Sequence, residues 1–219
     1  MKIILLNLLL FFLTAPASVL PPNGLQDEPN NEKEVELFNG EDLTGWHGNM
    51  EYWRAENGMI VGEFSELPAS QFLYHNQVVE DFRLILNVRT VDGKVNSGIQ
   101  FRSEALPNGQ VRGPQADIGD GFWGKLYEEF GRAWLWEGNE CDQHHVEKES
   151  WNEYELLAID SLTKIAINGK VCMEYDDPVI TRKGILALQL HAGFPAGRIE
   201  FKDIRLTLNP SDRSLITAE

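Results

Sequence analysis

Short segments in which polar and apolar residues alternate follow one another along most of this chain of 219 residues. Successive side chains of a β-strand point to opposite faces, so this alternation is typical of strands with one buried face. Turn-forming residues separate the segments at intervals of about ten residues, the spacing of all-β sandwiches and barrels. The clearest segments are GMIVGEF, DFRLILNVRTV, SGIQFRSE, YELLAID, KIAINGK, GILALQLHAG and RIEFKDIRLTL. No amphipathic helical stretch of useful length competes, so we expect an all-β fold of two packed antiparallel sheets.

One domain accounts for these segments, which run from about Val35 to Leu208. A chain of this length usually forms a single domain, and no internal repeat is visible. Residues 18–34 are rich in proline, asparagine and acidic residues, which predicts a flexible leader. Residues 209–219 are expected to be a frayed polar tail. Within the domain, Asn168 and Gly169 separate two apolar runs and predict a hairpin turn.

The first residues have the pattern of a secretory signal peptide. Lys2 supplies a positive charge, and Ile3–Leu13 is apolar but too short to span a bilayer. Small residues at Ala15–Ala17 predict cleavage after Ala17. No other stretch is long and apolar enough to span a membrane, so we expect a periplasmic or secreted protein.

The charge balance limits the expected partners. With 34 acidic and 19 basic residues, the chain has a formal net charge of −15. Nucleic acids and anionic membranes are bound through basic patches, so neither is an expected partner. The balance fits a soluble protein with a neutral or cationic ligand, although acidity can serve solubility alone. The two cysteines, Cys141 and Cys172, could pair in an oxidising compartment, but the sequence leaves open whether they do.

Alternation also predicts which side chains share a face. Ile99 and Phe101 are expected in the core, as are Ala116 with Ile118 and the leucines at 186, 188 and 190. The opposite face then carries Gln100, Arg102, Glu104, Gln115, Asp117, Gln189 and His191. If these strands are neighbours, the polar residues meet beside Trp123, Tyr127 and Trp134. Aromatic faces stack on sugar rings while amides and guanidinium bond hydroxyls, so this face predicts a carbohydrate site; a merely solvated face is the alternative.

The central stretch GPQADIGDGFWGKLYEE should cross the site twice. Its glycines allow a tight reversal at Gly119–Gly121. Gln115 and Asp117 would lie on the outgoing strand, and Lys125 and Tyr127 on the returning one. Phe122 and Trp123 would wall the site and exclude water.

Several stretches resemble, in order, the motifs of the 3-keto-disaccharide hydrolase domain family. They are VELFNGEDLTGW, NSGIQFRSE, QADIGDGFWGKLYEEFGRAWLW, WNEYELLAID, INGK and GILALQLHAG with IEFKDIRL. The resemblance covers nearly all of the chain beyond the leader. It implies a jelly-roll sandwich of the concanavalin and laminin-G type, with its site on the concave sheet. It also implies hydrolysis of glycosides already oxidised to a ketone at C3 of one sugar. Other members of the family are similar to extracellular sugar-binding modules.

The central motif departs from a common family pattern. Many members carry roughly Y-E-x-Q-I-x-D, whereas this chain has Gln115, Asp117 and Asp120 at the corresponding places. The carboxylate has therefore moved by two residues along the same face. An acid stays in the site, but the resemblance no longer assigns a role to each position.

A ketone at C3 makes the C2 proton acidic, so a base can remove it and the enolate can expel the anomeric oxygen. Water then adds to the enone, and the net result is hydrolysis. This route needs a base, an acid and a stabiliser for the enolate. Asp117 or His191 could be the base with the other as acid, and Arg102 or Lys125 could hold the enolate. A divalent metal ion bound through Asp117 and His191, with Glu104 as a further candidate ligand, is an alternative stabiliser.

The predicted catalytic residues are Asp117, His191, Arg102 and Lys125. The predicted substrate-binding residues are Gln100, Glu104, Gln115, Trp123, Tyr127 and Gln189. A two-carboxylate glycosidase scheme is a rival and would pair Asp117 with Glu128 or Glu129. The main functional alternative is a non-catalytic carbohydrate-binding jelly roll, which would use the same face without an acid–base pair.

Overall fold

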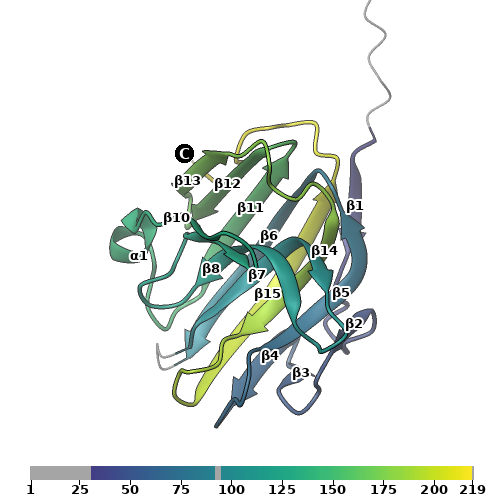
Figure 1. Ribbon diagram of the computed structural model, residues 1–219, viewed down its shortest axis with the longest axis vertical. Coiled ribbons are helices and arrows are strands. Elements are labelled where there is room, and N and C mark those ends of the chain that lie inside the picture. The colour runs from purple at the N-terminus through teal and green to yellow at the C-terminus, as the bar shows by residue number, and fades with distance from the viewer. Residues whose placement is uncertain (1–30, 92–94, 219) are drawn as a thin grey trace, which may run out of the picture. The chain divides into compact units, whose positions relative to one another are not determined.

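The computed structural model describes residues 31–91 and 95–218. The predicted signal peptide and most of the predicted leader lie outside the described residues. The described residues form fifteen β-strands and one short helix, α1 (Glu140–His144). The strands make two antiparallel sheets (Figure 1). The predicted all-β fold with two antiparallel sheets is confirmed.

The larger sheet has eight strands. Its order is β13 (Lys170–Asp176), β12 (Leu162–Ile167), β11 (Asn152–Ile159), β6 (Phe82–Val91), β15 (Gly197–Leu208), β4 (Met59–Phe64) and β3 (Trp53–Glu56), with β1 (Lys33–Glu36) also paired to β15. β1 thus begins two residues before the expected start of the domain at Val35. The turn between β12 and β13 is formed by Asn168 and Gly169, both with positive φ, as the hairpin prediction requires.

The smaller sheet has seven strands and carries the site described below. Its order is β10 (Ala133–Trp136), β9 (Leu126–Glu129), β8 (Val111–Ile118), β7 (Ser97–Ala105), β14 (Gly184–Leu190), β5 (Gln71–Val79) and β2 (Trp46–Gly48). The predicted inward residues, including Ile99, Phe101 and Leu188, are buried in one apolar cluster with residues of the larger sheet such as Leu84 and Phe201. Alternation therefore identified the core face correctly.

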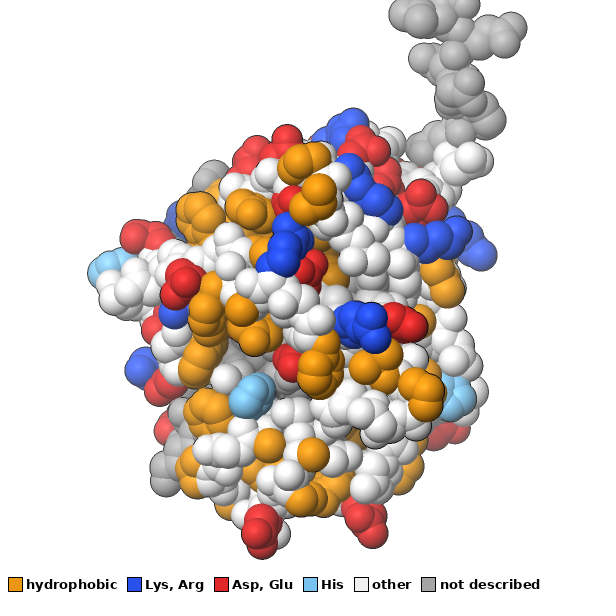
Figure 2. Space-filling view, in the orientation of Figure 1, with side chains coloured by type: hydrophobic (Ala, Val, Ile, Leu, Met, Phe, Trp, Pro, Cys, Tyr) orange, Lys and Arg blue, Asp and Glu red, His pale blue; other side chains and the backbone are white. Residues whose placement is uncertain are grey.

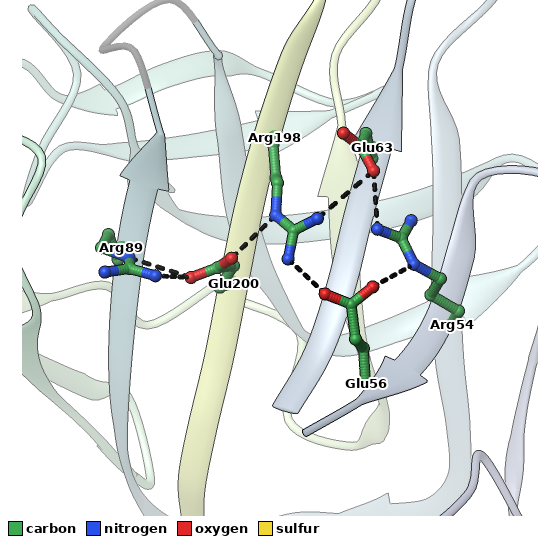
Figure 3. Close-up of polar contacts among 6 residues, drawn as sticks. All are labelled: Arg54, Glu56, Glu63, Arg89, Arg198 and Glu200. Carbon is green, nitrogen blue, oxygen red and sulfur yellow. Dashed lines mark hydrogen bonds and ion pairs between the residues drawn. The ribbon is translucent and has the colours of Figure 1, made fainter. Parts of the chain in front are cut away.

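Ion pairs bridge four neighbouring strands of the larger sheet (Figure 3). Arg198 on β15 lies at their centre and pairs with Glu200, Glu56 and Glu63 at 2.7, 2.8 and 3.4 Å. Arg89 on β6 and Arg54 on β3 extend the pairing at its two ends.

On the face drawn in Figure 2, basic side chains stand singly or beside acidic ones, and no extended basic patch is visible there.

Residues 212–217 are held against the larger sheet, contrary to the expectation of a frayed tail. Arg83 on β6 donates hydrogen bonds from Nη2 to the carbonyl oxygens of Asp212 and Ser214, at 2.9 and 2.6 Å. Glu155 on β11 accepts hydrogen bonds from the backbone N–H groups of residues 216 and 217. Arg83 and Glu155 also pair with each other at 3.0 Å. The tail therefore satisfies buried charges that alternation alone could not connect with it.

The two cysteines form a disulfide, the question that the sequence left open. Cys141 on α1 and Cys172 on β13 are bonded, with their Cα atoms 5.3 Å apart. The bond joins the helix to an edge strand of the larger sheet. Within the described residues, no helix is long and apolar enough to cross a membrane.

Candidate active site

The hairpin of β8 and β9 brings the central motif together. Gly119, Gly121 and Gly124 all have positive φ, which lets the chain reverse between the two strands. The Asp117 N–H donates to the carbonyl of Lys125 at 3.0 Å, and Gln115 is the cross-strand partner of Tyr127. The predicted reversal, with Gln115 and Asp117 on the outgoing strand and Tyr127 on the returning strand, is confirmed. Lys125 lies just before β9 begins.

A cavity of about 290 Å³ opens where this hairpin meets the neighbouring strands. β8 and β9 supply two residues each, β10 supplies one, and the connections before β7, after β8 and after β14 supply the rest. The lining residues are Asn96, Gln115, Asp117, Phe122, Tyr127, Glu129, Trp134, His191 and Phe194. Four of the predicted site residues therefore line this cavity: Gln115, Asp117, Tyr127 and His191. A larger space of about 550 Å³ lies beside β1, lined by none of the predicted site residues.

Aromatic rings form a continuous rim around the cavity. The rings of Phe122 and Trp134 lie nearly parallel with their centroids 6.3 Å apart, and Tyr127 meets Trp134 edge-on at 5.0 Å. Phe194 contacts both Phe122 and His191 edge-on, at 6.1 and 5.7 Å. Trp134 is 38% exposed, which is a large fraction for an indole. Such a rim can take the apolar face of a sugar ring.

Asp117 is the buried acid of the site. The residue is only 3% exposed, and burial is the main cause that raises its pKa to about 8. The charge of Glu129 contributes to this rise, while the Gln115 hydrogen bond and the charge of Lys125 oppose it. Oδ1 of Asp117 accepts a hydrogen bond from Gln115 Nε2 at 2.7 Å. Oδ2 has no hydrogen-bond partner among the described residues, so a neutral Asp117 can offer its proton there to a ligand.

His191 and Glu129 also line the cavity. Nδ1 of His191 is 2.5 Å from the carbonyl oxygen of Ala192. A carbonyl oxygen only accepts hydrogen bonds, so Nδ1 carries a proton and Nε2 is left as the possible base. Burial raises the pKa of the Glu129 carboxyl, while His191 and a hydrogen bond from Gln189 lower it. Glu129 is therefore placed to interact with a positive charge on His191.

Asn96 and Phe194 line the cavity but were not among the predicted site residues. Asn96 is 7% exposed, and its side-chain amide has no hydrogen-bond partner in the part of the chain that the structure describes. The backbone carbonyl oxygen of Asn96 accepts a hydrogen bond from the backbone N–H of His191 at 3.0 Å, which holds the two residues together. Both residues lie in connections next to strands, where alternation carries no information. The only sequence signal for Asn96 was its place at the start of NSGIQFRSE.

Gln100 and Gln189 lie beneath the cavity and do not line it. Both are fully buried and have no exposed surface with which to contact a sugar. This differs from the prediction that they bind the substrate directly. Their cross-strand partners are Ala187 and Phe72, two members of a small apolar cluster on this face of the sheet. These apolar neighbours explain why the amides are not exposed.

Arg102 also lies away from the cavity. The pairing of β7 with β8 shifts register between Gln100 and Glu104, and Arg102 has a φ of 48°. This bulge breaks the alternation on which the prediction depended. The guanidinium instead donates to the carbonyl oxygens of residues 80 and 160 and to the carboxylate of Asp81, at 2.6, 2.7 and 3.1 Å. Its role as an enolate stabiliser is not supported by this placement.

Three further predicted residues are not among those that line the cavity. Glu104 is exposed and 4.0 Å from Arg112, and Trp123 is buried in the hydrophobic core. Lys125 is outside the lining, with Nζ 5.8 Å from the ring of Phe122 and 5.5 Å from that of Trp134. The wall of the cavity on this side is therefore formed by Phe122 and Trp134.

Of the two carboxylate pairs considered for a glycosidase scheme, only Asp117 with Glu129 lies in the cavity. Glu128 does not line it and instead pairs with Arg132 at 2.7 Å. Among the described residues, no three side chains of His, Cys, Asp or Glu are grouped closely enough to hold a metal ion.

Solved structures with the same fold include carbohydrate-active and carbohydrate-binding proteins. A proposed glycosyl hydrolase from Parabacteroides distasonis is 22% identical, with a TM-score of 0.62 over 80% of this chain and 98% of that one. A second from the same organism is 18% identical, with a TM-score of 0.60 over 79% and 92%. The carbohydrate-binding module CBM66 from Bacillus subtilis is 16% identical, with a TM-score of 0.58 over 73% and 93%. These likenesses confirm the jelly-roll sandwich. No curated protein matches the sequence significantly.

The sequence also matches a known family. The model of the family described as 3-keto-alpha-glucoside-1,2-lyase-like domain matches residues 33–207, which is most of the chain and nearly all of the described sandwich. That range contains every residue that lines the cavity. The chain therefore belongs to the 3-keto-disaccharide hydrolase family, as its motifs indicated.

Proposed function

We propose that this protein cleaves glycosides oxidised to a ketone at C3, by elimination followed by addition of water. One observation carries the proposal: a single small cavity holds both a buried carboxyl with a raised pKa, Asp117, and a histidine with a free Nε2, His191. An acid and a base on one cavity are what the elimination needs. Membership of the family supports the same substrate class.

The elimination step uses both residues. Nε2 of His191 removes the proton from C2, and the electron pair of that bond forms the enolate with the C3 ketone. The enolate then reforms the ketone, a double bond forms between C1 and C2, and the bond from C1 to the leaving oxygen breaks. Asp117 gives its proton to that oxygen. The products of the step are an alcohol or sugar and an enone, with His191 protonated and Asp117 ionised.

The hydration step restores both residues. Water adds to C1 of the enone while His191 returns its proton to C2, and Asp117 takes a proton from the water. The net reaction is hydrolysis, and the enzyme returns to its starting protonation state. The negative charge of Glu129 stabilises His191 while the imidazole is protonated, because opposite charges close together favour the charged form.

Asn96 is the donor best placed for the enolate oxygen. Its amide lines the cavity, is nearly buried and is unpaired among the described residues. A preorganised N–H donor aimed at developing negative charge is typically worth a factor of about 10²–10³ in kcat. Asn96 thus takes the role that the sequence had suggested for Arg102 or Lys125.

The cavity suits one sugar ring. Its volume of about 290 Å³ is at the small end of ligand pockets. Trp134 on the rim is 38% exposed and can contact the rest of the glycoside outside the cavity.

The test is incubation with 3-keto-trehalose and with 3-keto-glucosides, following release of free sugar, with and without EDTA. The same glycosides with an ordinary hydroxyl at C3 are the controls. We expect release from the keto compounds only, because an unoxidised sugar has no acidic C2 proton. Equal release from keto and unoxidised compounds would contradict the elimination route and favour the pair of Asp117 with Glu129.

A non-catalytic sugar-binding module is the second candidate, favoured by the likeness to CBM66 and by the exposed rim tryptophan. Binding of the keto glycosides without any release of sugar would establish that reading instead.

Export is also part of the proposal. The disulfide between Cys141 and Cys172 is typical of an oxidising compartment, and the first residues have the pattern of a signal peptide. Protein isolated from its native host should begin at Ser18, and an intact Met1 would contradict export by this signal.

A further inference from the structure

A chain of hydrogen bonds runs beneath the cavity and ends on its two carboxyl groups. Ser103 Oγ lies 3.0 Å from Gln100 Oε1 and 2.9 Å from the backbone carbonyl oxygen of Phe101, and Gln100 Nε2 donates to Gln115 Oε1 at 2.9 Å. Gln115 Nε2 then donates both to Asp117 Oδ1 at 2.7 Å and to Gln189 Oε1 at 3.0 Å. Gln189 Nε2 lies 3.4 Å from Glu129 Oε2 and completes the second branch. All three amides are buried.

The amides are oriented in one direction. Gln115 accepts a hydrogen bond on its oxygen from Gln100, Gln189 accepts one from Gln115, and both donate from nitrogen toward the carboxyl groups. Turning any one amide over would set two oxygens or two NH₂ groups against each other. Such mismatches are costly in a buried site, so the orientation of Gln115 depends on that of Gln100.

A glycine makes the branch point possible. A Cβ atom on Gly98 would lie 2.6 Å from Cγ and Cδ of Gln115, closer than real atoms approach. Gly98 is the cross-strand partner of Asp117 on the neighbouring strand β7. The missing side chain therefore leaves room for the Gln115 amide to lie over β7 and reach both Asp117 and Gln189.

The direction of the chain decides where Asp117 carries its proton. Gln115 presents an N–H group to Oδ1, so a proton on Asp117 must sit on Oδ2, the oxygen without a partner among the described residues. If Gln115 turned over, its carbonyl oxygen would accept that proton in a hydrogen bond. Asp117 would then no longer offer it to the leaving oxygen of a substrate.

We propose that Gln100, which does not line the cavity, is a positioning residue for Gln115. It holds the Gln115 amide in one orientation, and that orientation keeps the Asp117 proton facing the cavity. The proposal rests on the proposed function for its effect on turnover, but not for the orientation of the amide. It gives Gln100 a role that differs from direct sugar binding.

Two substitutions separate positioning from packing. Gln100→Met removes the donor without adding a charge, so residue 100 no longer fixes the orientation of the Gln115 amide. Gln100→Glu keeps the size of the side chain, and burial favours the neutral form of its carboxyl, whose O–H can still donate to Gln115 Oε1. We expect kcat to fall about 10- to 100-fold in Gln100→Met, part of the effect of a whole acid–base group, and less in Gln100→Glu. KM should change little in both, because residue 100 does not line the cavity.

The control and the background variant make the test specific. Gln110→Met changes a glutamine whose amide bonds Ser70 and has no part in the chain, so it should leave kcat unchanged. In an Asp117→Asn background, Gln100→Met should cause no further loss, because residues that act through one group are not additive. A full additional loss in that background would show that Gln100 acts on something other than Asp117.

Nuclear magnetic resonance of the side-chain amides gives a readout that does not depend on activity. The Gln115 amide signals should shift in Gln100→Glu and Gln100→Met and stay in place in Gln110→Met. Unchanged Gln115 signals in folded Gln100 variants would overturn the proposal, whatever the turnover. A wild-type protein without turnover on keto glycosides would instead remove the proposed function and leave the amide chain to be judged by these signals.

Discussion

Replacing Asp117 with asparagine should make the protein more stable at neutral pH while removing its activity. Asparagine is nearly isosteric with a protonated aspartate, and its amide oxygen can still accept the Gln115 hydrogen bond. The change removes the carboxyl whose burial raises its pKa from 3.8 to about 8. Keeping an acid in a site that favours its neutral form costs stability wherever the unfolded chain would ionise it.

The sign and size follow from the two pKa values. The folded-state pKa of about 8 lies above the unfolded value of 3.8, so on raising the pH the unfolded chain loses its proton first. The contribution of Asp117 to stability is therefore fully present below about pH 4 and is lost progressively up to about pH 8. At pH 7 the loss spans roughly three pH units of about 1.36 kcal/mol each, or on the order of 4 kcal/mol. Asp117→Asn escapes this loss, which corresponds to a melting temperature higher by roughly 10 °C at pH 7.

The assay is thermal melting of wild type and Asp117→Asn between pH 4 and pH 9, with keto-glycoside turnover measured on the same samples. The two melting temperatures should agree near pH 4 and diverge as the pH rises. Turnover of the variant should fall by about 10²–10⁴. Asp120→Asn is the matched control, because Asp120 is exposed in the same hairpin turn and pairs with Lys148. A variant of Asp117 that is no more stable than wild type at pH 7, or that keeps full activity, would refute the reasoning.

Three other measurements address the acid, the rim and the hairpin turn. Turnover should decline as the pH rises through about 8, because Asp117 then loses the proton that it gives to the leaving oxygen; a rate that stays constant to pH 10 would exclude that role. Trp134→Ala should weaken sugar binding about tenfold, the scale of one aromatic contact, with kcat nearly unchanged; titration calorimetry measures the first, and a loss confined to kcat would contradict a stacking role. Reduction of the Cys141–Cys172 bond should lower the free energy of unfolding by about 2–4 kcal/mol. It should also weaken sugar binding, because the disulfide packs against Gly124 in the turn that carries Phe122. Melting and titration with and without dithiothreitol measure the two effects, and the absence of both would contradict a role for the bond at the site.

Local patterns predicted the parts of this fold that depend on neighbouring residues. Alternation identified the core rows around Ile99 and Leu188, and glycines identified the reversal that pairs Gln115 with Tyr127. Asn168 with Gly169 identified a hairpin because that turn needs positive φ at both residues. In each case the cause lies within a few residues of the effect.

The errors have nonlocal causes. Arg102 does not lie on the predicted face because β7 bulges between Gln100 and Glu104. No local residue pattern indicated this register shift. Gln100 lies on the predicted face, but it is fully buried, and its cross-strand partner Ala187 is distant in the sequence. Asn96 was missed because the connections at the ends of strands follow no period.

The central claim is that this cavity performs elimination and addition rather than direct displacement at C1. It is tested most directly by cleaving a 3-keto-glucoside in D₂O and examining C2 of the released 3-keto sugar. A sample of the released sugar kept in D₂O without enzyme corrects for exchange in the free product. The account predicts deuterium at C2, because the proton on Nε2 of His191 exchanges with D₂O before it is returned to C2. The label should appear at a rate that matches release of the alcohol and should be lost in His191→Ala. Release of the alcohol with hydrogen retained at C2 would contradict it.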